Sequence, residues 1–278
     1  MTTGAVALQH PSPTFHNVQG VICREVQNVL PIVGTLAVLE ATADAQEQLV
    51  DEALALDGEQ STDGEKRIKE GDPYGAVLWP AAWATANFLL TKPNFINNLS
   101  SMSVLELGTG TGLVSLAVAM AGARRVLATD YEPLALSLVD YAAKNLENSI
   151  QIPIEKQLLD LCDLGTPLPK GFDLVVAADI MYEPKTGMAM AHRVVEALQN
   201  NSQVVVGDSP GRAGRPVFLR TLQDLGVRGE FEDAIGMTCS GPRHDLICGK
   251  DSKSVSDVPQ ELPVAILHLE PKSLQKIR

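Results

Sequence analysis

The sequence contains few aromatic residues and few positive charges. Aromatic residues make up 4% of its 278 residues, and lysine and arginine number 22 against 34 aspartates and glutamates. The resulting formal net charge is −12. Proteins that bind nucleic acid usually present a basic surface, so this balance argues against a nucleic-acid partner. A basic protein partner is compatible with it, because an acidic chain attracts such a partner.

Cysteine is also scarce, and the four cysteines show no Cys-x-x-Cys spacing. This usage fits a reducing compartment. Cys239, His244 and Cys248 lie loosely together in the sequence, but their irregular spacing predicts core and loop residues and not a metal site. We therefore expect no bound metal.

Long apolar stretches are absent as well. No stretch free of glycine reaches the roughly 20 apolar residues of a membrane-spanning helix, and the N-terminus lacks the charged start and apolar centre of a secretory signal. We expect no membrane association and a cytoplasmic location. The residues before Glu25 contain no acid, several serines and threonines, and a single arginine, Arg24. That composition keeps import into an organelle as an alternative.

The most informative stretch runs from Ser103 to Asp130. Residues 104–107 are a short apolar run, typical of a strand buried on both faces. A turn with three glycines, an apolar helix over 113–123 and a second strand over 125–129 follow. Glycine allows the backbone to approach a ligand closely, the start of a helix presents free N–H groups, and Asp130 can accept hydrogen bonds from a ribose diol. The stretch predicts a site for an adenosine-containing cofactor.

The glycine spacing distinguishes between such cofactors. A dinucleotide fold requires Gly-x-Gly-x-x-Gly, whereas this chain has Glu-x-Gly-x-Gly-x-Gly, with Leu113 where the third dinucleotide glycine would lie. Glu106, inside the strand, places a negative charge near the turn, which suits a cofactor with a cationic amino-acid tail. The pattern resembles the first motif of class I S-adenosylmethionine-dependent methyltransferases. An ordinary tight strand-to-helix turn is the alternative interpretation.

The rest of the chain divides into three predicted parts. Residues 1–72 form an N-terminal extension, with a flexible start over 1–20, two short strands that form a hairpin, a helix and an exposed charged loop. The strands are expected over 21–29 and 32–41, the helix over 43–56 and the loop over 57–72. Residues 73–270 form the cofactor-binding domain, which begins with a helix over 81–90, and residues 271–278 form a C-terminal tail.

Strands and helices alternate through the predicted domain, which indicates a parallel sheet wound on both faces. After residue 130 the expected helices lie over 134–146, 188–199 and 217–225, and the expected strands over 154–159, 172–177, 203–207, 229–232, 245–248 and 262–269. The strand-rich end predicts a closing antiparallel hairpin. Four residues fall at the carboxyl ends of strands, where ligands of such sheets bind: Gly108, Asp130, Asp160 and Asp179.

Five motifs occur in a fixed order: LWP at 78–80, ELGTGTG at 106–112, Asp130, LDL at 159–161 and DIMY at 179–182. This order resembles the seven-β-strand protein-lysine methyltransferases of methyltransferase family 16, over residues 72–269. The resemblance implies an α/β fold with a doubly wound, mostly parallel seven-stranded sheet. It also implies S-adenosylmethionine as cofactor and a lysine of a protein substrate as methyl acceptor.

The resemblance further implies a set of site residues. The cofactor is expected to contact Trp79, Glu106, Gly108, Thr109, Gly110, Asp130, Asp160, Leu161 and Ala178. Asp179 and Tyr182 are expected at the substrate amine as the catalytic residues. Many family members have a tryptophan beside the adenine where this chain has Leu161, so the family's ring stacking is not expected there.

The chemistry of lysine methylation gives these two residues roles. Only an uncharged amine is nucleophilic, and free lysine has a pKa of about 10.4. Asp179 could orient the nitrogen and accept its proton or pass it to water, and Tyr182 could present an aromatic face to a methylated cation. The alternatives are a helix cap for Asp179 and a core-edge aromatic for Tyr182. Trp79 has the same two interpretations, a wall over the cofactor or a core aromatic.

Two further features bear on the substrate. The Asn/Asp-Pro-Pro-Tyr signature of base-modifying and glutamine-modifying methyltransferases is absent, because Ile180 and Met181 stand where the prolines would be. In the loop over 207–212, a structural turn with a surface ion pair is favoured over substrate contact by Asp208 or Arg212.

The leading hypothesis for the function is a protein-lysine N-methyltransferase. The alternatives are a small-molecule, nicotinamide-like N-methyltransferase and a cofactor-binding interaction protein without turnover. The sequence does not determine the oligomeric state.

Overall fold

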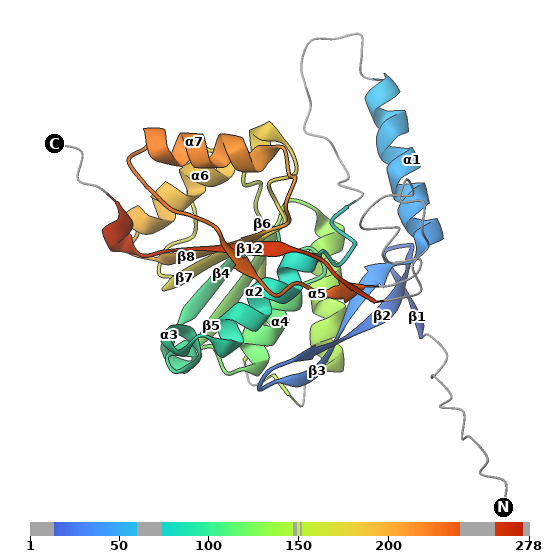
Figure 1. The fold of residues 1–278 in the computed structure, drawn as a ribbon. Coiled ribbons are helices and arrows are strands. Elements are labelled where there is room, and N and C mark those ends of the chain that lie inside the picture. Colours follow the sequence, from blue (N-terminus) through green and yellow to red (C-terminus); the bar gives the residue numbers. More distant parts are fainter. Residues whose placement is uncertain (1–13, 60–73, 147–148, 151, 240–258, 275–278) are drawn as a thin grey trace, which may run out of the picture.

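Figure 1 shows the computed structural model of the chain, which describes residues 14–59, 74–146, 149–150, 152–239 and 259–274. Its central element is a seven-stranded sheet in the order β6-β5-β4-β7-β8-β12-β9. The strands are β4 (Ser103–Leu107), β5 (Arg125–Asp130), β6 (Ile154–Leu158), β7 (Leu174–Ala178), β8 (Gln203–Asp208), β9 (Glu232–Ala234) and β12 (Val264–Leu269). The strands β4 to β8 are parallel, and β12 runs antiparallel to both β8 and β9. The predicted fold class and its antiparallel closure are confirmed.

Helices cover both faces of this sheet (Figure 1). One face packs against α2 (Pro80–Thr91), α4 (Leu113–Met120) and α5 (Pro133–Asn145), and the other against α6 (Pro184–Gln199) and α7 (Gly214–Asp224). Alternate residues of one strand enter different cores: Val104 joins the first cluster and Leu105 the second. Both faces are therefore apolar, which explains the near-continuous hydrophobic runs of these strands.

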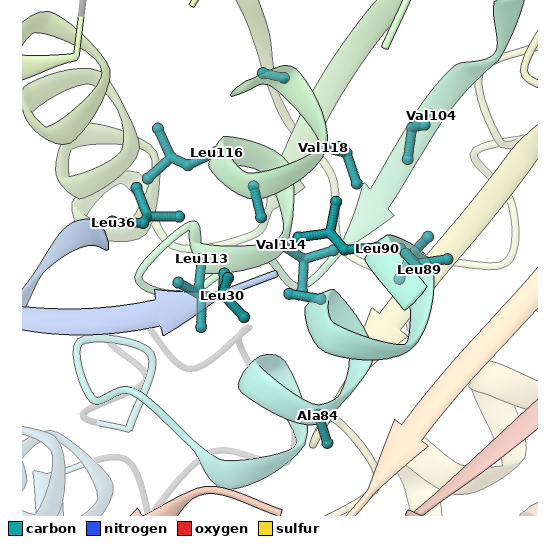
Figure 2. Packing of buried hydrophobic residues seen from close by; sticks show 14 of the residues in the cluster. Leu30, Leu36, Ala84, Leu89, Leu90, Val104, Leu113, Val114, Leu116 and Val118 are labelled. Carbon is teal, nitrogen blue, oxygen red and sulfur yellow. The ribbon is translucent and has the colours of Figure 1, made fainter. Parts of the chain in front are cut away.

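A second, three-stranded antiparallel sheet precedes the main one. It consists of β1 (Phe15–Val18), β2 (Val21–Leu30) and β3 (Gly34–Ala41), and α1 (Ala43–Glu59) follows it. The predicted hairpin is confirmed, but residues 15–18, expected within a flexible start, form a strand paired with β2. Figure 2 shows Leu30 and Leu36 of this sheet in one apolar cluster with Leu113 and Leu116 of α4. The N-terminal sheet thus shares its core with the cofactor-binding domain.

Several predicted boundaries shift for local reasons. The helix expected over 113–123 ends at Met120, because Gly122 adopts a left-handed φ of 88°. The helix expected from residue 188 begins at Pro184, where proline suits the first turn and Glu183 and Thr186 form a capping box. The helix expected from residue 217 begins at Gly214, with Pro216 in its first turn.

The remaining short elements are α3 (Pro93–Ile96), the 3-10 helices η1 (Leu99–Ser101) and η2 (Pro271–Ser273), β10 (Thr238–Cys239) and β11 (Gln260–Glu261). The strand expected over 245–248 and most of the loop expected over 57–72 lie outside the described residues. His244 and Cys248 also lie outside them. The described part of the chain contains no cluster of three or more metal-ligating side chains. Among its helices, none combines the length and apolar character that crossing a membrane requires.

Candidate functional site

The site is built on the bend between β4 and α4. Gly108 and Gly110 both adopt left-handed φ angles, 67° and 52°, which glycine reaches without strain. A Cβ atom on Gly108 would lie 2.7 Å from Cγ2 of Ile180, and one on Gly110 would lie 3.2 Å from the carbonyl oxygen of Gly75. The backbone here is therefore closely surrounded. The N–H of Thr109 donates to the carbonyl of Thr129 at 2.9 Å and ties the bend to the end of β5.

Glu106 lies beneath this bend and is 2% exposed. Its Oε2 accepts hydrogen bonds from the Thr109 hydroxyl at 2.8 Å, the Ser115 N–H at 3.0 Å and the Ser115 hydroxyl. Burial raises the pKa of Glu106 to about 7, although these hydrogen bonds favour the charged form. Glu106 thus joins the bend to the first turn of α4 from inside the protein. It was expected to contact the cofactor, but it is not among the residues that line the cavity described next.

A cavity of about 190 Å³ opens above the bend. It is lined by Tyr74, Gly75, Trp79, Gly108, Gly110, Asp130, Tyr131, Leu161, Ala178, Asp179, Ile180, Tyr182 and Arg212. The structure therefore brings eight of the eleven predicted site residues to one cavity. The other three lie behind its wall: Glu106, Thr109 and Asp160.

The loop after β6 forms one side of the cavity through Leu161. Asp160 shapes this loop, since its Oδ1 accepts the N–H of Cys162 at 2.7 Å. Arg193 of α6, which is only 1% exposed, holds the loop from below by donating from Nε to the carbonyl of Leu161 at 3.0 Å. Arg193 is not among the predicted site residues. An arginine on the apolar face of a helix is its only sequence signal.

Asp179 follows β7 and has a left-handed φ of 55°. Its side chain is 0% exposed. Oδ2 accepts the N–H of Ala81 at 2.9 Å and the hydroxyl of Ser209 at 3.0 Å, while Oδ1 accepts the N–H of Ser209 at 2.9 Å. Ala81 lies in the first turn of α2, whose own N-cap residue, Trp79, makes no side-chain cap. Asp179 therefore caps helix α2, which precedes it in the sequence: Ala81 and Asp179 are 98 positions apart. The cap expected for Asp179 was one for the turn that follows it.

Aromatic rings and one arginine form the outer end of the cavity. The indole Nε1 of Trp79 donates to the carbonyl of Tyr74 at 3.0 Å, and their ring centroids lie 6.3 Å apart. The guanidinium carbon of Arg212 lies 4.8 Å from the centroid of Trp79. Tyr182 is 42% exposed at this end. The ion pair expected at the surface of this loop is replaced by two pairs with buried carboxylates: Arg212 pairs with Asp179, and Arg215 pairs with Asp208. Arg212 and Asp179 both line the cavity.

Trp79 is held from the N-terminal sheet. The segment before it is tied to β3 by two hydrogen bonds: Ala41 N–H to the carbonyl of Ala76 at 2.8 Å, and Leu78 N–H to Oε2 of Glu40 at 3.2 Å. Glu40 is fully buried, and its Oε1 accepts Arg24 Nη2 at 2.7 Å. The N-terminal extension therefore positions one wall of the site.

Comparison with known proteins identifies the family. The sequence profile of the lysine methyltransferase family matches residues 65–224, more than half of the chain. The chain belongs to this family.

Curated relatives include two lysine methyltransferases of the electron transfer flavoprotein beta subunit. The one from Xenopus laevis is 33% identical over 159 residues, which are 56% of this chain and 60% of that protein. The one from Homo sapiens is 32% identical over 149 residues, 53% of this chain and 52% of that protein. The protein-lysine methyltransferase METTL21E of Mus musculus is 37% identical over 123 residues, 42% of this chain and 50% of that protein. The chain thus spans about half the length of these relatives.

This lysine methyltransferase family uses S-adenosylmethionine as methyl donor, and the cavity residues fit that molecule. Asp130 accepts the N–H groups of Gly110 and Glu132, each at 3.0 Å, and a carboxylate retains further lone pairs for a ribose diol. Leu161 and Ala178 offer apolar surface for an adenine. At the glycine bend, the absence of side chains lets Ile180 and the Gly75 carbonyl, which also line the cavity, approach the backbone closely.

Five residues line the cavity but were not predicted as site residues: Tyr74, Gly75, Tyr131, Ile180 and Arg212. Two of them carried a weak sequence signal. Tyr131 directly follows Asp130 at a strand end, and Arg212 lies in the turn-rich loop after β8. Ile180 lies within the DIMY motif, next to Asp179, whereas Tyr74 and Gly75 reach the cavity from the segment before Trp79.

Proposed function

We propose that this chain is an S-adenosylmethionine-dependent methyltransferase that modifies a lysine side chain of a protein substrate. The observation that carries the proposal is that one cavity is lined both by the family's glycine bend with Asp130 and, at its open end, by aromatic side chains. Tyr74 and Tyr182 at that end are 51% and 42% exposed, so a side chain of another protein can reach it.

The proposed mechanism uses the residues of this cavity in distinct ways. When bound, S-adenosylmethionine supplies a methyl group activated by a positively charged sulfonium. Asp130 and the glycine bend would hold its adenosine end. Trp79, Tyr74 and Tyr182 offer aromatic faces, which attract the cationic groups of a methylated amine. Most of the acceleration comes from holding the reacting groups in line within one enclosed space.

Asp179 receives a positioning role in this mechanism. Its buried carboxylate is already occupied by three hydrogen bonds, so accepting the proton of the amine would disrupt the start of α2 and the loop at Ser209. We propose that the amine loses its proton to water, while Asp179 keeps Trp79 and the loop over 209–212 at the cavity. The direct base role remains the alternative that mutation tests.

The first protein substrate to test is the electron transfer flavoprotein beta subunit, because several relatives are named for methylating it. A calorimetric titration with S-adenosylmethionine measures cofactor binding, and incubation with radiolabelled cofactor, this subunit and a cell extract measures transfer. We expect cofactor binding and label in a protein band. Absence of binding at high micromolar cofactor would refute the proposal, and label confined to small molecules would favour the small-molecule alternative.

The cytoplasm is the proposed location of the protein. Its support is the cysteine usage of the sequence. Fractionation of cells that express a tagged chain tests it: recovery with an organelle would contradict the proposal.

A further inference from the structure

Arg212 places a permanent positive charge at the aromatic end of the cavity. Its Nη2 lies 3.5 Å from Oδ1 of Asp179, and its guanidinium stacks on Trp79. The side chain is 23% exposed, so most of it is shielded from water. A guanidinium stays protonated at every pH at which an enzyme works. An amine that enters the cavity at this end therefore approaches the Arg212–Asp179 ion pair and not a carboxylate alone.

Two carboxylates near this end of the cavity, those of Asp179 and Asp208, belong to ion pairs. The charged residues that line the cavity are Asp130, Asp179 and Arg212. Asp179 is paired with Arg212 and bound by backbone and hydroxyl donors. The adjacent Asp208 is paired with Nε of Arg215 at 2.6 Å. An unpaired carboxylate at the acceptor end would stabilise an ammonium, whereas the Arg212–Asp179 pair presents no net negative charge.

We propose that Arg212 promotes methyl transfer by keeping the acceptor amine uncharged, an inference that rests on the proposed function. A nearby positive charge disfavours the protonated form of an amine. The N–H bond of the ammonium breaks, the proton leaves to water, and the nitrogen keeps the electron pair that makes it a nucleophile. Arg212 acts on this equilibrium through its field, from the aromatic end of the same cavity, and takes up no proton itself.

Charge-changing variants separate this role from a packing role. Arg212→Gln removes the charge, Arg212→Met removes it while keeping a long apolar stem against Trp79, and Arg212→Lys keeps the charge. Arg125→Gln is the matched control, because Arg125 also pairs with a carboxylate, Glu155 at 2.7 Å, and also stacks on a ring, Phe172 at 4.6 Å. It begins β5, at the opposite end of the strand from Asp130.

The measurement is the initial rate of label transfer to protein at saturating substrate, where the pH profile reports the bound amine. It runs from about pH 6.5 to about pH 11, across the ordinary pKa of lysine. We expect Arg212→Gln and Arg212→Met to shift the rise in rate by about one pH unit to higher pH. They would then be about 10-fold slower at the low end and approach the unmodified chain at the high end. Arg212→Lys and Arg125→Gln are expected to keep the original profile. Thermal melting and cofactor titration of each variant accompany the rates.

Two results overturn different statements. If Arg212→Gln and Arg212→Met lost the same share of the rate at every pH, Arg212 would be a packing residue. The same conclusion would follow if Arg212→Lys lost as much rate as they do. Either result would refute the inference and leave the proposed function standing. Absence of protein label with the unmodified chain at every pH would refute the proposed function, and the inference with it.

Discussion

Replacing Asp179 with alanine tests whether this carboxylate organises the site or removes a proton. The change leaves the buried N–H of Ala81 and the N–H of Ser209 without their acceptor and leaves Arg212 without its partner. Each unsatisfied buried donor costs about 1–3 kcal/mol, and alanine is strained at the left-handed φ of 55°. We expect the free energy of unfolding to fall by about 3–5 kcal/mol.

Asp179→Asn makes the test more specific. Asparagine tolerates the left-handed backbone and keeps one carbonyl acceptor, so the expected loss of unfolding free energy is smaller, about 1–2 kcal/mol. Asp173→Ala is the control: Asp173 also accepts a backbone N–H, that of Ser103 at 2.7 Å, but its side chain is 49% exposed. Water can replace this bond, so we expect a loss below about 1 kcal/mol.

Urea unfolding followed by tryptophan fluorescence measures these free energies, and calorimetric titration measures cofactor affinity. We expect both Asp179 variants to lose stability and turnover together. An Asp179→Ala protein as stable as the unmodified chain, with normal cofactor affinity and no turnover, would show that the carboxylate acts on the amine and that the capping explanation is wrong.

Three further changes follow from single contacts. Burial raises the pKa of Glu106 to about 7, so the folded protein holds a proton that the unfolded chain releases near pH 4.3. The free energy of unfolding therefore falls as pH rises between these two values. Glu106→Gln should reduce this fall by on the order of 2 kcal/mol, measured by urea unfolding at low and high pH. Asp130→Ala should weaken S-adenosylmethionine binding by about 1–3 kcal/mol in calorimetry, through lost ribose hydrogen bonds. In Gly187→Ala, the new Cβ would meet the carbonyl oxygen of Gly214 at 2.2 Å, so unfolding free energy should fall by about 3 kcal/mol, against under about 0.5 kcal/mol for the exposed Met188→Ala.

Each of these predictions has a contradicting result. An unchanged pH slope in Glu106→Gln would assign the decline to other groups. Unchanged cofactor affinity in Asp130→Ala would place the ribose elsewhere. A Gly187→Ala protein of normal stability would show that α6 and α7 can separate without loss.

The sheet and the glycine bend were predictable because their signals are local. Apolar runs, helical spacing and the three glycines lie within short windows, and parallel strands bring their carboxyl ends to one edge. Gly108 and Asp130 could therefore be placed together from sequence alone. The strand-rich end predicted an antiparallel closure but not the strand order β8-β12-β9, because pairing between distant strands leaves no local pattern in the sequence.

The contacts of the acceptor end were not predictable in the same way. Asp179 caps a helix far from it in sequence, and Arg212 meets Trp79 only because the loop after β8 and the start of α2 reach the same edge of the sheet. The support that Glu40 gives to the segment before Trp79 depends on the register of the N-terminal sheet against that segment. Contacts of this kind depend on tertiary packing between distant segments, and the sequence motifs do not predict them.

Mass spectrometry of a protein substrate, after incubation with the chain and S-adenosylmethionine, shows whether the chain methylates a lysine of a protein. We expect one or more methyl groups on a lysine side-chain nitrogen, at a level that falls with Asp130→Ala. A chain that binds the cofactor and methylates small molecules of the extract, but leaves every protein lysine unmodified, would contradict it.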